Sequence, residues 1–137
     1  MTPNPGTLGA VFAGLYAAHQ VADHWIQTQH QADAKGGTGW PGRLACAAHV
    51  ATYTATALVA LLAVAWRTGL TLSPAAVAAG LAVSAGTHYL ADRRAPLRRM
   101  ADRLGKDPYW LVHGGGMYAL DQSWHIGWLL IAALIIT

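Results

Sequence analysis

Four long stretches without Asp, Glu, Lys or Arg constrain the fold of this chain most. They run from Thr2 to Ala22, Leu44 to Trp66, Leu70 to Ala91 and Gln122 to Thr137. The middle two reach the length of about 20 residues that a helix needs to cross a hydrocarbon core about 30 Å thick. The outer two need a few polar residues inside the helix to reach it. The sequence therefore predicts four transmembrane helices, near residues 7–31, 44–67, 73–94 and 116–136.

The composition agrees with a small membrane protein. The chain has 137 residues, of which 54% are hydrophobic and 11% charged, and it contains no glutamate. Glycine and proline separate the apolar stretches, at Gly36-Gly37, Ser73-Pro74 and Gly114-Gly115-Gly116. We expect one integral-membrane domain, residues 1–137, of the all-α class. It is a four-transmembrane-helix bundle with a short basic interfacial helix within residues 95–113, between the third and fourth spans.

Basic residues lie on one side of such a bundle. Only Arg67 falls in the second connection, and the others lie in or beside the first and third: Lys35, Arg43, Arg93, Arg94, Arg98, Arg99, Arg103 and Lys106. Cytoplasmic loops carry the excess of Lys and Arg. The sequence predicts a multi-pass protein of a bacterial inner membrane, with both termini outside. The segment from Arg93 to Lys106 is expected to contact anionic lipid headgroups rather than nucleic acid.

Three of the predicted helices carry a histidine and an aspartate four residues apart. The pairs are His19 with Asp23, His88 with Asp92 and, in reversed order, Asp121 with His125. Residues four apart lie on one face of a helix. The fourth helix runs opposite to the first and third, so in all three pairs the aspartate lies nearer the cytoplasm. Ionisable residues inside apolar spans are candidates for a functional site.

A metal centre explains this set economically. His49 from the second helix lies at a similar depth, and imidazole with carboxylate suits zinc, iron or manganese. The predicted ligands are His19, Asp23, His49, His88, Asp92, Asp121 and His125. Two divalent ions with a hydroxide would balance three carboxylates, and one ion would need a further proton or cation. The charge therefore permits one or two ions.

A purely structural interpretation is the alternative. Polar side chains in membrane bundles can hydrogen-bond across helices, and Arg93 or Arg94 could neutralise Asp92. Other ionisable residues are expected to face solvent or headgroups: His24, His30, His113, Asp33, Asp102 and Asp107.

The joint pattern resembles a widespread family of small integral-membrane proteins of bacteria and phages whose function is unknown. It consists of His19-x3-Asp23-x3-Gln27, the single His49, His88-x3-Asp92 and Asp121-Gln122-x2-His125. The resemblance implies a multi-helix inner-membrane protein and supplies no reaction. A looser similarity is to inner-membrane metal-dependent hydrolases, which also place His and Asp in transmembrane helices.

From these residues we predict a metal-dependent hydrolase that acts on a lipid or lipid phosphate at the cytoplasmic face. Asp121 or Asp92 is the candidate general base. The alternatives are a transporter or binding protein for metal ions or protons, and a noncatalytic interaction protein with a structural polar core. The membrane lipid is the expected partner, and a homo-oligomer is compatible with the sequence.

Overall fold

The computed structural model describes residues 4–137, and every regular element within that range is a helix. The all-α class is thus confirmed. Residues 1–3, with which the predicted domain and the first apolar stretch begin, lie outside the described residues. The elements are α1 (Pro5–Val21), the π-helix η1 (Ala22–Ile26), α2 (Gln29–Ala34), α3 (Gly39–Thr68), α4 (Pro74–Asp92), α5 (Ala95–Arg103), α6 (Pro108–His113) and α7 (Gly116–Ile136).

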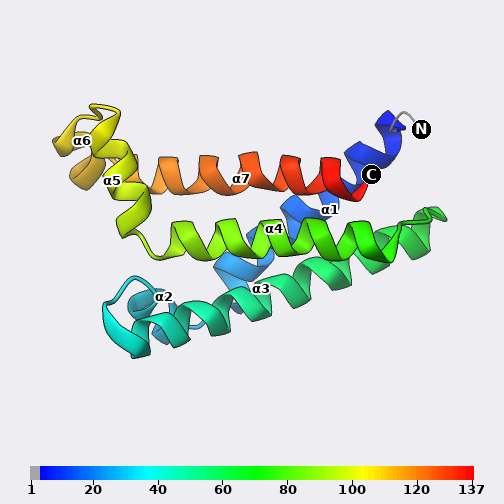
Figure 1. The fold of residues 1–137 in the computed structure, drawn as a ribbon, viewed down its shortest axis with the longest axis horizontal. Coiled ribbons are helices and arrows are strands. Elements are labelled where there is room, and N and C mark those ends of the chain that lie inside the picture. Colours follow the sequence, from blue (N-terminus) through cyan, green and yellow to red (C-terminus); the bar gives the residue numbers. More distant parts are fainter. Residues whose placement is uncertain (1–3) are drawn as a thin grey trace.

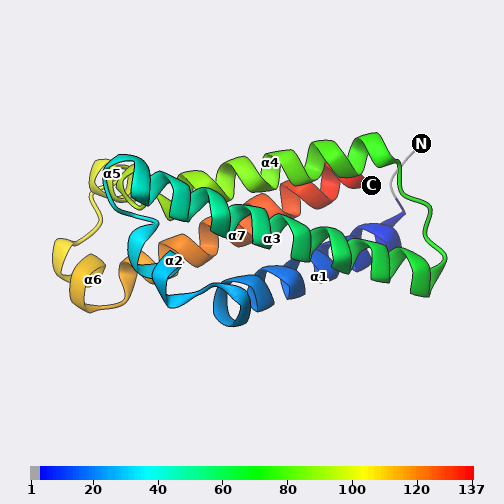
Figure 2. The ribbon, with the colours of Figure 1, turned by 90° about the horizontal axis from the view of Figure 1, so that it is seen from below.

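Four long helices, α1, α3, α4 and α7, form a bundle (Figures 1 and 2). Both α1 and α4 pack against α3 and against α7, so the four helices form a ring. The short helices α2, α5 and α6 gather at one end of this bundle, which we call the capped end (Figure 1). Helix α1 begins and α7 ends at the opposite, open end.

Local sequence signals explain where several helices begin and end. Asn4, Ser73 and Asp107 each cap the N-terminus of a helix with a side-chain oxygen, and a proline follows each of them. Such a proline suits the first turn because no intrahelical partner exists there for its missing N–H. Gly69 ends α3 with a φ of 71°, in the left-handed region that favours glycine.

Two helices, α3 and α7, are long and apolar enough to cross a membrane. Helix α1 has 17 residues before its π-helical extension, and the 19 residues of α4 are rich in alanine and glycine rather than in large apolar side chains. A bundle with four spans therefore remains a prediction. Large apolar side chains are nevertheless exposed along both α3 and α7, among them Leu62 and Leu134. Apolar surface of this kind favours contact with lipid.

The first two predicted helices have different bounds from those expected. The predicted helix 7–31 ends at Ile26, because Gln27 leaves the helical region (φ −56°, ψ 125°) and Thr28 starts α2. Thr28 and Gln31 exchange side-chain to backbone hydrogen bonds, a capping box that favours a new helix over a continuous one. The second helix begins at Gly39 rather than at residue 44. Arg43, predicted in the connection, consequently lies in the first turns of α3.

The third connection contains two helices where one was predicted. Helix α5 carries Arg98, Arg99 and Arg103 and buries Leu97 and Ala101, as expected for an amphipathic segment. Gly105, with a φ of 66°, and the cap Asp107 then separate it from α6. The prediction missed α6 because the continuous basic pattern ends before it.

The open half of the bundle has an apolar core. Its buried side chains include Val11, Leu15, Ala57, Leu61, Leu81, Leu129, Ala132, Ala133 and Ile136. Gly80 permits the close approach of α4 to α7, because a Cβ at this position would lie 2.5 Å from Cγ1 of Ile136 and 2.9 Å from the carbonyl oxygen of Ala132. Small residues at helix contacts let membrane helices pack closely.

The substitution Gly80→Ala should therefore separate α4 from α7. We expect the free energy of unfolding to fall by about 1–3 kcal/mol, the usual cost of overpacking a core. Gly86→Ala, on the same helix, is the matched control, since a Cβ there meets nothing within 4 Å. Thermal unfolding of both variants in detergent tests this packing, and equal melting temperatures would contradict it.

Candidate metal centre

A π-helical segment places the first histidine–aspartate pair. Within η1 the N–H of Gln27 bonds to the carbonyl oxygen of Ala22, five residues back, at 2.8 Å. Asp23 lies in this wider turn and His19 in the last turn of α1, with 3.6 Å between Asp23 Oδ2 and His19 Nδ1. π-Helical turns inside α-helices are frequent at functional sites.

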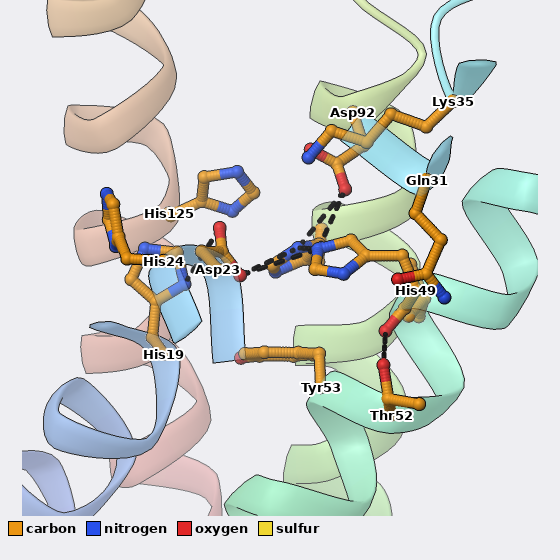
Figure 3. A network of polar contacts seen from close by, with 12 residues as sticks. His19, Asp23, His24, Gln31, Lys35, His49, Thr52, Tyr53, Asp92 and His125 are labelled. Atoms are coloured by element: carbon orange, nitrogen blue, oxygen red, sulfur yellow. Dashed lines mark hydrogen bonds and ion pairs between the residues drawn. The ribbon is translucent and has the colours of Figure 1, made fainter. Parts of the chain in front are cut away.

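The other helices supply the remaining predicted residues. His49 comes from α3, His88 and Asp92 from α4, and Asp121 and His125 from α7. The four histidines and Asp92 are buried, while Asp23 and Asp121 are partly buried. All seven predicted residues thus meet inside the bundle, in its half nearer the capped end. Figure 3 shows His19, Asp23, His49, Asp92 and His125 among them.

Four of these side chains form one compact group, which we call site A. His49 Nε2 and His88 Nε2 are 3.0 Å apart. Asp23 Oδ1 lies 3.4 and 3.6 Å from these two nitrogens, and Asp92 Oδ2 lies 3.3 and 3.2 Å from them. Metal–ligand bonds of about 2.0–2.2 Å place neighbouring ligand atoms about 3–3.5 Å apart. The spacing of Asp23, His49 and His88 is therefore that of ligands around one ion, and Asp92 lies beside both histidines.

The remaining predicted ligands lie directly beside site A. His19, His88 and His125 each place one ring nitrogen within 4.8 Å of the other two. Asp92, Asp121 and His125 form a similar group. His49, predicted at a similar depth, lies level with the carboxylates, because it contacts both Asp23 and Asp92.

Several atoms of this cluster are buried and make no hydrogen bond within the described residues. They are both ring nitrogens of His19, Asp23 Oδ1, Asp92 Oδ2, Nδ1 of His49 and of His88, and His125 Nε2, together with Gln27 Nε2 nearby. A buried polar atom without a partner costs about 1–3 kcal/mol. If these polar residues served only to hold the helices together, their side chains would form hydrogen bonds with one another. The open lone pairs therefore fit a bound cation better than structural hydrogen bonding.

Lys35 neutralises Asp92, a role that the sequence interpretation offered to Arg93 or Arg94. Lys35 Nζ lies 2.7 Å from Asp92 Oδ1. Arg93 instead donates to the carbonyl oxygens of Lys35 and Gly37, and Arg94 to that of Ala32. The alternative with an arginine was wrong because both guanidinium groups hold the chain around α2. Asp92 Oδ2 stays free to face His49 and His88.

Tyr53 and Ser84 close the cluster toward the open end. The Tyr53 hydroxyl and Ser84 Oγ are 2.5 Å apart and buried. The Tyr53 ring stacks on that of His88 with 4.0 Å between centroids. Beyond them, toward the open end, the buried side chains of the described residues are apolar.

A cavity of about 830 Å³ connects the cluster with the capped end. Three carboxylates of the cluster line it: Asp23, Asp92 and Asp121. Lys35, Arg94 and Arg98 add positive charge, and apolar side chains, among them Leu97, Leu111, Val112 and Met117, complete the wall. This cavity is large enough for a small ligand or for one end of a larger one.

The ionisable residues expected outside the site lie outside the cluster, but His24 lines the cavity beside it. His24, His30 and His113 are exposed, and His24 Nδ1 lies 3.0 Å from the carbonyl oxygen of Gln20. Asp33, Asp102 and Asp107 are also exposed. Asp102 pairs with Arg98 at 2.9 Å, while Asp107 caps α6.

Comparison with protein-family models, with curated proteins and with solved structures gives no match for this chain. Any function must therefore be argued from the residues of the cluster and the cavity.

If the cluster holds metal, loss of one ligand should release it. We expect His88→Ala to weaken the binding of zinc or manganese to the detergent-purified protein by more than about 100-fold, since even residues behind the ligands contribute 10- to 100-fold. His30→Ala, an exposed histidine on α2, should bind as the wild type does. Metal analysis and competitive chelation provide the measurement. A purely structural cluster would instead lose about 0.6–2 kcal/mol of stability and no metal.

Proposed function

We propose that the protein is a membrane-embedded, metal-dependent hydrolase that acts on phosphorylated lipids at the cytoplasmic face. The observation that carries this proposal is the cavity. It joins a buried cluster of histidines and aspartates to a wall that is both cationic and apolar.

The membrane setting is part of the proposal. The four long helices span the bilayer, and the capped end, with α5 on its surface, faces the cytoplasm. Eight of the nine lysines and arginines support this orientation, since they lie at the capped end and Arg67 lies at the open end. The cavity then opens at the depth of the lipid headgroups.

This orientation can be tested with single cysteines. Arg99→Cys on α5 and Arg67→Cys at the end of α3 should react with a membrane-impermeant thiol reagent from opposite sides, because both residues are exposed and lie at opposite ends of the bundle. Cys46 is buried and should give little background. Labelling of both positions from the same side would refute the proposed topology.

The cavity wall suits an amphiphile with a phosphate group. Arginine and lysine are the residues that bind phosphate oxygens, and Lys35, Arg94 and Arg98 lie beside the carboxylates. Leu97, Leu111, Val112 and Met117 provide a surface for an acyl or isoprenoid chain. A water-soluble phosphate ester would leave this apolar surface without a partner.

Asp121 is the better candidate for the general base. Its side chain is 28% exposed, lines the cavity and lies 3.6 Å from His125 Nε2. Asp92, the other candidate, is held by Lys35 and faces the two nitrogens of site A, so it is a ligand instead. Asp121 takes a proton from water as the water oxygen bonds to phosphorus. The bond from phosphorus to the lipid oxygen breaks, and the proton passes to that oxygen. A bound metal ion would activate the water and polarise the phosphoryl oxygen.

Transport of ions or protons is the alternative function. The apolar half of the bundle is evidence against a transport path through it. Beyond Tyr53 and Ser84, the described core consists of apolar side chains. A transport path would need polar groups there to replace hydration. Flux of metal or protons into liposomes that contain the protein would favour the transporter and contradict the hydrolase if lipid phosphate is not turned over.

Hydrolysis of a long-chain phosphate monoester in detergent or nanodiscs provides the direct test. We expect chelation to abolish phosphate release and Asp121→Asn to lower kcat by about 10²- to 10⁴-fold, the usual contribution of a general base. Arg98→Met should lower kcat/KM by about 10- to 100-fold, because a charge-assisted hydrogen bond contributes about 1.5–3 kcal/mol. Arg99→Met, an exposed neighbour, is the matched control. Equal activity of the two methionine variants would remove Arg98 from the site.

A further inference from the structure

The two carboxylate oxygens of Asp23 face different histidines of the cluster. Its Oδ1 belongs to site A, where it faces His49 and His88 at 3.4 and 3.6 Å. Its Oδ2 points the other way, to His19 Nδ1 at 3.6 Å. A carboxylate whose two oxygens face different sets of nitrogen atoms has the arrangement of a bridge between two metal ions.

The second group contains His19, which faces Oδ2 of Asp23, and His125 next to His19. The two imidazole rings have centroids 4.9 Å apart, and one nitrogen of each lies within 4.8 Å of the other. Both residues are buried, at 0% and 3% exposure, and neither ring nitrogen of His19 nor Nε2 of His125 has a hydrogen-bond partner among residues 4–137. These unpartnered nitrogens are not used by site A.

We propose that the cluster holds two divalent transition-metal ions bridged by Asp23. One ion is bound at site A by Asp23, His49, His88 and Asp92, and the other by His19, Asp23 and His125, which we call site B. The two sites differ in a functional respect. Site A has four protein ligands, as closed structural metal sites have, whereas site B has three, as catalytic sites with an open position have.

Asp121 connects site B with the cavity. Its Oδ1 lies 3.6 Å from His125 Nε2, and its side chain lines the cavity. Water at the open position of site B would thus lie beside the candidate base. The assignment of site B as the catalytic site rests on the proposed hydrolase function, but the two-ion bridge does not.

Charge predicts unequal affinities for the two ions. Three carboxylates and Lys35 leave a net charge of about −2 in the cluster, which one divalent ion neutralises. A second ion adds uncompensated positive charge in a buried place, unless an anion accompanies it. Site B should therefore bind its ion more weakly than site A, and inorganic phosphate should strengthen that binding.

Titration of the metal-free, full-length protein with Mn²⁺, followed by calorimetry and electron paramagnetic resonance, tests the proposal. Wild type and His30→Ala should bind two ions per chain in the presence of inorganic phosphate and show the spectrum of a spin-coupled pair. His125→Gln should retain one uncoupled ion at site A, with binding of the second weakened by more than about 100-fold. His19→Gln should behave in the same way, and a melting temperature close to that of wild type verifies that each variant is folded.

Three results would overturn the proposal. They are a single ion in the wild type at saturating Mn²⁺ and phosphate, two uncoupled ions, or complete loss of metal in both His125→Gln and His19→Gln while the proteins remain folded. These measurements need no substrate. A spin-coupled pair of Mn²⁺ ions in a protein without hydrolase activity would refute the proposed function but would still support the two-ion centre.

Discussion

The desolvation of three carboxylates and four imidazoles inside one small bundle is the constraint on which the rest of this structure depends. Buried charges are strongly unfavourable unless they are paired or coordinate a metal. Lys35 compensates one carboxylate, and the described residues provide hydrogen bonds for only part of the remaining polar atoms. The bundle therefore has two halves, with Tyr53 and Ser84 at the boundary. Buried carboxylates and imidazoles in the polar half favour a bound cation, and the apolar half forms a packed hydrophobic core.

The capping helices follow from the same constraint. Lys35 can reach Asp92 only because α2 folds back against the bundle, and Arg93 and Arg94 hold that turn through backbone carbonyl oxygens. Arg94 has a φ of 58°, an uncommon conformation for a residue with a Cβ. A Cβ at Gly36 would lie 2.8 Å from the Arg94 side chain, so a larger residue there would displace that side chain. The wall of the cavity and the neutralisation of Asp92 thus depend on one junction.

Much of the centre could be predicted from the sequence, because spacing of four residues is a local property of helices. The pairs on α1, α4 and α7 converge for that reason, and the reversed order on α7 matches its direction in the bundle. Contacts made by tertiary folding could not be predicted in the same way. Lys35 was counted as a charge of the connection, and nothing in its neighbourhood indicated a partner 57 positions away in the sequence. The π-helical turn at Asp23 also lacks a sequence signal that periodicity would detect.

Lys35 changes the charge argument about the number of ions. Three carboxylates alone favour two ions with a hydroxide, whereas three carboxylates with Lys35 are already neutralised by one divalent ion. Within the described residues, both ring nitrogens of His19 and Nε2 of His125 nevertheless stay buried without hydrogen-bond partners after site A is complete. Both observations agree if the second ion is held weakly until an anion arrives through the cationic wall of the cavity. The net charge of the centre would then differ between its one-ion and two-ion states. The negative charge of a bound phosphate would neutralise the positive charge that the second ion adds.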